Sequence, residues 1–281
     1  MAPMPSTSRV IRFVSWNVRA AIGPGEFPGT WWRRPDAGRL RAIVDALNAL
    51  HADVIGLQEC ATLNVDGRRH DTAAELAALA GMHHRFAATR HFGIVEDNGR
   101  LSGSGLFGNA LLSRLDIGPS HTVALPMMPS DGFVEPPGAD HPLAGVRYTD
   151  APEGVREPRC LLTADVMGVS VGVTHLSHIG SAERTLQAAA VDASMPRDRS
   201  VLLGDLNASI ESEELSLLRG TWTDAFEAAG VAARDERRVT TETGSRIDHI
   251  LVRGLGVRSC RVVDEVGWLS DHLPIVAELE A

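Results

Sequence analysis

Short apolar runs rich in Val, Ile and Leu recur along the whole chain, and segments with helical periodicity lie between several of them. Runs with the β-branched and aromatic content of strands cover residues 9–18, 52–60, 108–114, 159–166, 169–178, 200–208, 245–252 and 272–280. Apolar residues at helical spacing cover residues 37–50, 72–82 and 181–194. Strands and helices mixed this densely predict an α/β (α+β) layered sandwich.

The chain has 281 residues, of which 44% are apolar and 22% charged, so it is long enough to bury a large core. No Gly/Ser-rich or charged linker divides it, and we expect a single domain over residues 1–281. One segment breaks the pattern, because residues from about 119 to 158 are rich in Pro, Gly and Asp. Such a segment predicts a long irregular loop, either a lid that shapes the substrate site or a disordered stretch.

The formal net charge of -9 argues against a broad electrostatic footprint for DNA or RNA and leaves room only for a local basic patch. No apolar stretch approaches the roughly 20 residues that cross a bilayer, and the first residues lack the apolar core of a signal peptide. We therefore expect a soluble cytoplasmic monomer without stable membrane insertion. Cys60, Cys160 and Cys260 are too few and too far apart for a disulfide framework, which indicates reduced structural thiols.

Polar side chains that suit metal or phosphate binding lie at or next to the ends of the apolar runs. They are Asn17, Glu59, Asn109, His175, Asp205, Asn207, Asp248, Asp271 and His272. Taken singly, most also fit ordinary roles, such as a turn, a helix cap or a solvated strand end. Asp248 is different, because an unpaired Asp inside the apolar run "RIDHILV" would cost on the order of several kcal/mol to bury. It needs a partner.

His175 and His178 stand three residues apart in "THLSH", a spacing that suits zinc if the segment is helical. The preceding "VSVGV" instead predicts the end of a strand, on which the two rings point in different directions. The sequence therefore disfavours a zinc site here.

The motifs "SWNV", "GLQEC", "GNALLSR", "EPRCLL", "VTHLSH", "GDLNA", "RIDHILV" and "SDHLPIV" occur in this order. Together they resemble the endonuclease/exonuclease/phosphatase superfamily, which includes deoxyribonucleases, abasic-site endonucleases, neutral sphingomyelinases and inositol-polyphosphate phosphatases. The resemblance runs from about residue 10 to the last residue. It implies a four-layer sandwich of two packed mixed β-sheets flanked by helices, with a metal-dependent phosphoesterase site at one edge.

The resemblance also implies roles for individual residues. Metal binding falls to Asn17, Glu59 and Asp271, with Glu59 as the principal Mg²⁺ ligand. Catalysis falls to His175, Asp205, Asn207, Asp248 and His272. Within this set, His272 contacts the scissile phosphate and Asp248 orients it, while Asp205 and Asn207 handle the attacking water and the phosphate. Substrate binding falls to Asn109, Arg159 and His178.

These residue types suit the expected chemistry. Mg²⁺ prefers oxygen ligands and keeps several waters, so one or two carboxylates with an amide oxygen and a substrate phosphate suffice, and Mn²⁺ is a natural substitute. We expect a Mg²⁺-dependent hydrolase that uses activated water on a phosphoester of a small or medium phosphorylated substrate. The alternatives are a DNA endonuclease or exonuclease of the same superfamily, and a catalytically silent binding domain on this fold.

Overall fold

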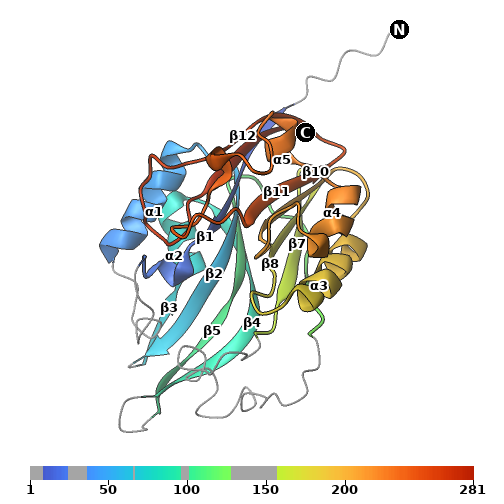
Figure 1. Cartoon of the computed structure of the whole chain (residues 1–281). Coiled ribbons are helices and arrows are strands. Elements are labelled where there is room, and N and C mark those ends of the chain that lie inside the picture. Colours follow the sequence, from blue (N-terminus) through green and yellow to red (C-terminus); the bar gives the residue numbers. More distant parts are fainter. Residues whose placement is uncertain (1–8, 25–36, 66, 96–100, 128–156) are drawn as a thin grey trace.

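The computed structural model describes residues 9–24, 37–65, 67–95, 101–127 and 157–281. Two β-sheets pack face to face, and helices cover the outer face of each (Figure 1). Both sheets are mixed, since each contains one parallel pair among antiparallel pairs. The predicted sandwich of two mixed sheets flanked by helices is confirmed.

The first sheet has seven strands and runs in the order β12-β13-β1-β2-β5-β4, with β3 paired to β2. Its strands are β1 (Val10–Asn17), β2 (Val54–Val65), β3 (Arg68–Asp71), β4 (His83–Val95), β5 (Leu101–Ser113), β12 (Gly256–Val262) and β13 (Ile275–Glu280). Its outer face carries α1 (Ala37–Ala49) and α2 (Thr72–Ala80), and α2 ends before Gly81, which adopts a left-handed φ of 66°. A 3-10 turn, η1 (Arg19–Ala21), follows β1.

The second sheet has six strands in the order β10-β11-β9-β8-β7-β6. Its strands are β6 (Ser120–Ala124), β7 (Cys160–Val166), β8 (Val169–His175), β9 (Ser200–Asp205), β10 (Thr223–Asp224) and β11 (Asp248–Arg253). The remaining helices are α3 (Ser181–Ser194), α4 (Ser216–Thr221) and α5 (Ala225–Ala228), with 3-10 turns η3 (Glu213–Leu215) and η4 (Glu236–Arg238).

Three apolar interfaces hold the four layers together. One lies between the sheets, one between the first sheet and α1 and α2, and one between the second sheet and α3 and α4. Strand β1 serves two of them, because Phe13 points into the space between the sheets while Val14 points toward the helices. Burial on both faces explains why the strands are continuous apolar runs rather than alternating ones.

Gly56 marks a close approach between the sheets. A Cβ atom at this position would lie 2.7 Å from Cβ of Leu203 and 3.2 Å from Cγ1 of Val173, both in the second sheet. Only a residue without a side chain fits here. Strands β2 and β9 thus contact each other across the two sheets, and Glu59 lies three residues further along β2.

Strand β2 does not end at Gln58 and Glu59, as the apolar run alone predicts. It continues to Val65, and its pairing with β5 shifts register between Leu57 and Cys60. Glu59 adopts a positive φ of 58° at this irregularity. A β-bulge lets a strand continue while it re-aims one side chain, so the strand end expected at Glu59 is wrong for this physical reason.

The expected irregular loop at about 119–158 also needs a correction. Residues 120–124 form β6, an edge strand that pairs antiparallel with β7. The segment of the expected lid, residues 128–156, lies outside the described residues. Within the described ranges, none of the helices has the length and apolar content that crossing a membrane requires.

Candidate active site

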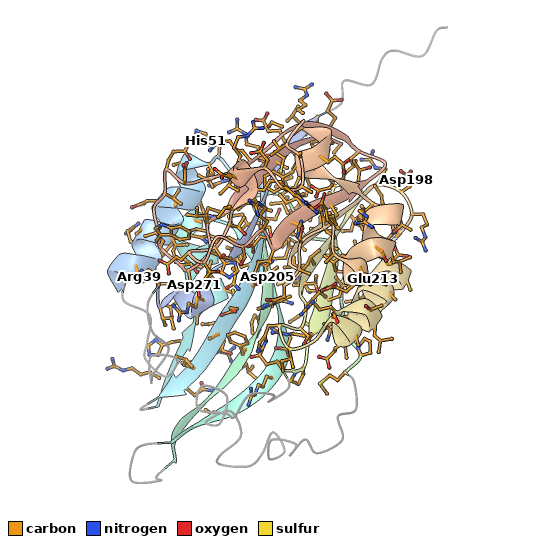
Figure 2. All side chains as sticks on the ribbon, viewed as in Figure 1. Arg39, His51, Asp198, Asp205, Glu213 and Asp271 are labelled. Carbon is orange, nitrogen blue, oxygen red and sulfur yellow. The ribbon has the colours of Figure 1, made fainter. Side chains whose placement is uncertain are left out.

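The polar ends of both sheets meet at one edge of the sandwich. Asn17 and Asp205 end β1 and β9, while Asp248 begins the antiparallel strand β11 and Asp271 and His272 precede β13. Figure 2 shows Asp205 and Asp271 near the middle of the molecule, between α1 on one side and α3 on the other. The structure thus gathers side chains that are up to 255 positions apart, from residue 17 to residue 272.

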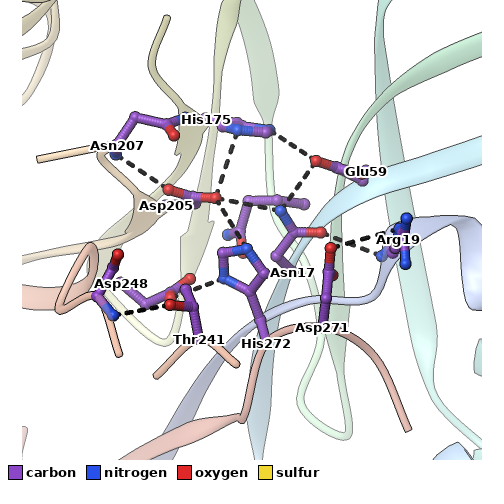
Figure 3. Close-up of polar contacts among 12 residues, drawn as sticks. Asn17, Arg19, Glu59, His175, Asp205, Asn207, Thr241, Asp248, Asp271 and His272 are labelled. Atoms are coloured by element: carbon purple, nitrogen blue, oxygen red, sulfur yellow. Dashed lines mark hydrogen bonds and ion pairs between the residues drawn. The ribbon is translucent and has the colours of Figure 1, made fainter. Parts of the chain in front are cut away.

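Asn17 joins the two sheets at this edge. Its buried amide nitrogen donates hydrogen bonds to Oε1 of Glu59 at 3.0 Å and to Oδ2 of Asp205 at 3.1 Å (Figure 3). Its amide oxygen accepts from the backbone N–H of Arg19 at 3.0 Å. One amide therefore holds a carboxylate of the first sheet beside a carboxylate of the second.

His272 and Asp248 form a buried pair, which provides the partner that Asp248 needs. Nδ1 of His272 lies 2.8 Å from Oδ2 of Asp248, and Nε2 lies 3.8 Å from Oδ2 of Asp205. Burial disfavours charge on the ring, but the negative charge and hydrogen bond of Asp248, helped by Asp205 and Asp271, outweigh it and raise the pKa of His272 to about 10. His272 is therefore an imidazolium at neutral pH.

His175 lies on the opposite side of Asp205. Its Nε2 is 3.4 Å from Oδ2 of Asp205, and its Nδ1 is 3.9 Å from Oε1 of Glu59. Burial, reinforced by the positive charges of Arg159 and His272, lowers the pKa of His175 well below its ordinary value. The site thus contains one neutral and one protonated imidazole, with Asp205 between them.

The two central carboxyl groups hold their protons more tightly than usual. Burial raises the pKa of Glu59 to about 7, against the Asn17 hydrogen bond and with the help of the negative charges of Asp271 and Glu157. Burial and the charge of Asp248 raise the pKa of Asp205. Oε2 of Glu59 is buried and has no hydrogen-bond partner within the described residues. A buried carboxylate oxygen without a donor is a position where a cation removes an energetic penalty.

Asn207 forms a turn that contacts the Asp205 carboxylate. Its backbone N–H donates to Oδ1 of Asp205 at 3.0 Å, and its side-chain nitrogen donates to the Leu176 carbonyl at 2.9 Å. Asn207 adopts a φ of 51°, which Asn tolerates better than most residues. The Asx turn that "GDLNA" suggests is therefore present, and it fixes the Asp205 carboxylate.

Arg19 is a site residue that the sequence did not reveal. Its side chain is buried, and Nε lies 3.3 Å from Oδ2 of Asp271 while a terminal nitrogen donates to the Gly23 carbonyl at 2.8 Å. Arg19, Ala20 and Ala21 all have positive φ, between 44° and 57°. Each such residue costs roughly 1–2 kcal/mol, so strain accompanies the placement of Arg19 beside Asp271. An Arg two positions after a strand-ending Asn is the only local signal.

The three residues expected to bind substrate lie apart from this cluster. Asn109 is buried and donates to the Cys160 carbonyl at 3.1 Å, and no hydrogen bond in the described ranges joins it to the central carboxylates. Arg159 and His178 contact each other and Glu157, near the end of β8. The structure therefore places Arg159 and His178 in a separate polar group.

Two sets of residues are candidates for a metal ion. Ligand atoms of Asp205, Asp248 and His272 lie within 4.8 Å of one another. In that set, however, His272 and Asp248 already share a short hydrogen bond, and a protonated imidazole offers no lone pair to a metal. The other set centres on Glu59, whose orphaned Oε2 and nearby Asp271 are the oxygen donors that a hard divalent cation prefers. The residues around Glu59 fit such an ion better.

The sequence matches a protein family over residues 14–272, nearly the whole length of the chain. Members of this family are phosphoesterase hydrolases. The family is described as the Endonuclease/Exonuclease/phosphatase family, and the chain belongs to it. The superfamily expected from the motifs is thereby confirmed.

Solved structures share the fold. An endonuclease/exonuclease/phosphatase from Beutenbergia cavernae has 24% identity and a TM-score of 0.68, with 97% of this chain and 72% of that chain covered. A mannosyl-6-phosphatase from Bacteroides thetaiotaomicron has 17% identity, a TM-score of 0.59 and coverages of 96% and 99%. TDP2 from D. rerio, complexed with a single-strand DNA product, has 16% identity, a TM-score of 0.57 and coverages of 97% and 99%. A comparison with curated protein sequences gives no match.

Proposed function

We propose that this protein is a Mg²⁺-dependent phosphoesterase that transfers the phosphoryl group directly to water, without a covalent enzyme intermediate. The observation that carries the proposal is the buried cluster in which Asn17 joins Glu59 to Asp205 while Asp248 keeps His272 protonated. Such a cluster combines a cation-binding carboxylate, a base and a positively charged hydrogen-bond donor. These are the groups that phosphoester hydrolysis needs.

Glu59 and Asp271 are the residues that would hold the cation, and Asn17 orients Glu59 toward it. When bound, a divalent ion polarises phosphoryl oxygens and favours formation of hydroxide from water. Direct coordination by Asn17 stays a prediction, because its amide oxygen accepts from Arg19 in this structure. Mn²⁺ is the expected substitute for Mg²⁺ because both accept oxygen ligands.

Asp205 is the proposed base. Its pKa is raised from an ordinary value of 3.8 to about 6, so it is ionised at neutral pH yet basic enough to take a proton from water. The water oxygen then forms the new bond to phosphorus, and the ester bond from phosphorus to the leaving oxygen breaks. The leaving oxygen takes a proton from solvent, and Asp205 returns its proton to solvent, which completes the exchange.

His272 and His175 are the proposed phosphate-binding groups. The Nε2–H of the His272 imidazolium points toward Asp205 across 3.8 Å and can donate to a phosphoryl oxygen, because Nδ1 is occupied by Asp248. His175 adds a neutral ring on the far side of Asp205. A charged donor that is positioned before the reaction stabilises the negative charge that develops on the phosphoryl oxygens.

We propose a small or medium phosphorylated molecule as substrate, because the net charge of -9 disfavours long polyanions. The fold similarity to a mannosyl-6-phosphatase supports this choice. The fold similarity to TDP2 in complex with a DNA product supports DNA as the second candidate. A single domain, a monomeric state and a cytoplasmic location remain predictions.

The test is hydrolysis by the full chain with Mg²⁺, with Mn²⁺ and with EDTA. Substrates would be 4-nitrophenyl phosphate, its bis ester, sugar and inositol phosphates, sphingomyelin, plasmid DNA and an abasic-site duplex. We expect metal-dependent turnover that is fastest on a small phosphate and falls with Glu59→Ala. Faster cleavage of DNA would favour the second candidate. A complete lack of metal-dependent turnover would leave the catalytically silent binding domain.

A further inference from the structure

Glu157, Arg159 and His178 form a polar group beside the end of β8. The ion pair of Arg159 and Glu157 is almost fully buried, with side chains 3% and 4% exposed. A terminal nitrogen of Arg159 also lies 3.2 Å from Nδ1 of His178, whose side chain is 50% exposed. The buried pair therefore lies behind a ring that reaches solvent.

This polar group is tied to the catalytic cluster through the backbone. His178 lies three residues after His175, and the intervening Leu176 donates its N–H to the Asp205 carbonyl at 2.9 Å. Arg159 directly precedes β7, whose residue Leu161 pairs with Thr174, next to His175. The positive charge of Arg159 also contributes to the lowered pKa of His175. Both residues thus flank the site on its His175 side.

The contact with Arg159 determines which nitrogen of His178 carries the proton. A guanidinium has only donors, so Nδ1 of His178 must be the acceptor in this hydrogen bond. Burial, the largest cause, and the charges of Arg159 and Arg184 lower the pKa of His178 against the opposing charge of Glu157, which leaves the ring neutral. A neutral ring with an accepting Nδ1 has its proton on Nε2.

Nε2 of His178 makes no hydrogen bond with any residue in the described ranges. Nε of Arg159 and both carboxylate oxygens of Glu157 are buried without a well-aligned hydrogen bond. Burying two charges costs free energy, and here both charged groups face Nδ1 of one half-exposed ring. They are explained if the ring must keep a defined tautomer.

We propose that the pair of Glu157 and Arg159 holds His178 as its Nε2–H tautomer and that this N–H donates to an oxygen of the bound phosphorylated substrate. His178 is then a substrate-binding residue, and Arg159 is a positioning residue. The inference rests on the proposed function for the identity of the ligand, a phosphate oxygen. It deepens that function by assigning a recognition contact outside the catalytic cluster.

The first test is side-chain ¹⁵N NMR of the full chain with Mg²⁺, with inorganic phosphate as the probe. We expect a protonated Nε2 at His178 in the free protein and movement of its signals as phosphate is added. His121, an exposed histidine of β6, is the matched control and should not respond. A proton on Nδ1 of His178, or signals that phosphate leaves unchanged, would overturn the proposal. A positive result stands even if no phosphoester is hydrolysed, which separates this inference from the proposed function.

The second test compares His178→Ala, His178→Gln and His121→Ala in hydrolysis of 4-nitrophenyl phosphate. Loss of a hydrogen bond to a charged oxygen should raise KM about 10-fold in His178→Ala with little change in kcat, since about 1.4 kcal/mol corresponds to a factor of ten. His178→Gln keeps an N–H donor and should recover part of the loss. Arg159→Lys should keep the Nε2–H tautomer of His178, and Arg159→Met should lose it. Unchanged KM in His178→Ala would contradict the proposal, even if the buried Arg159 variants fail to fold.

Discussion

The substitution Asp248→Asn separates the charge of Asp248 from its shape. Asn keeps an oxygen that can accept the Nδ1–H of His272, so the 2.8 Å contact can persist while the negative charge is lost. The rise in the pKa of His272 from 6.5 to about 10 corresponds to about 5 kcal/mol, at roughly 1.4 kcal/mol per pH unit. Burial opposes the charge, and Asp205 and Asp271 remain in the variant. We therefore expect the pKa of His272 to fall by about 2 pH units or more.

The change has a defined effect on stability. Because the folded-state pKa of His272 is raised, its protonated ring stabilises the fold fully below pH 6.5, and this contribution is lost as the pH rises through about 10. At pH 6 to 7, Asp248→Asn should lower the free energy of unfolding by about 3 kcal/mol. The free energy of unfolding should depend less on pH between 6.5 and 10 in the variant than in the wild type. Urea unfolding at a series of pH values in EDTA measures both effects.

The same substitution should change catalysis. At pH 9 a variant ring with a pKa of about 8 or lower is largely neutral, whereas the wild-type ring, with a pKa of about 10, is largely protonated. We expect kcat/KM at this pH to fall by about 10-fold or more, with the alkaline limb of the pH-rate profile displaced to lower pH. Asp116→Asn is the matched control, because Asp116 and His83 form an exposed pair at 3.5 Å that should contribute nothing measurable. If NMR titration of His272 and the alkaline limb are unchanged in Asp248→Asn, the reasoning is refuted.

Three further substitutions test the rest of the site and the packing beneath it. In Glu59→Gln, Mg²⁺ should no longer raise the Tm at pH 8 by differential scanning fluorimetry, whereas it should in the wild type. Without metal, the wild type should lose about 3 kcal/mol of stability as the pH rises from 4.5 through about 7, the raised pKa of Glu59, and the Gln variant should not. Asp205→Asn should lower kcat by about 10²-fold or more with an unchanged circular dichroism spectrum, and a near-normal rate would exclude Asp205 as the base. Gly56→Ala should destabilise the fold by about 1–3 kcal/mol in urea, because its Cβ would lie 2.7 Å from Cβ of Leu203, whereas Gly220→Ala has open space and should not.

Local patterns in the sequence were sufficient for most of the fold. The apolar runs and helical periodicities predicted β1, α1, α2, β7, β8, α3 and β9 close to their observed bounds, because period and β-branching report burial directly. Strands β3, β4, β6, β10 and β12 were missed. They lie at the edges of the sheets or carry mostly exposed residues, so they lack a distinct apolar run.

The position of the candidate site was also foreseeable. Polar residues at the ends of apolar strands have few purely structural explanations when there are many of them, and Asp248 required a partner because its burial would otherwise be costly. The motif order then indicated the family, and with it which strand ends come together. The central cluster of Asn17, Glu59, Asp205, His272 and Asp248 matches that expectation.

Other features depended on the tertiary structure alone. The bulge that re-aims Glu59, the buried Arg19 beside Asp271, and the contact of Arg159 with Nδ1 of His178 have no repeating local signature. Each results from how two sheets and their connecting loops pack against one another, so it is set by contacts between residues up to 252 positions apart, as for Arg19 and Asp271. The pKa values follow the same rule, because burial and neighbouring charge exist only once the chain is folded. The sequence alone determined which chemical groups are present and on which strands, and packing decided their orientation and charge.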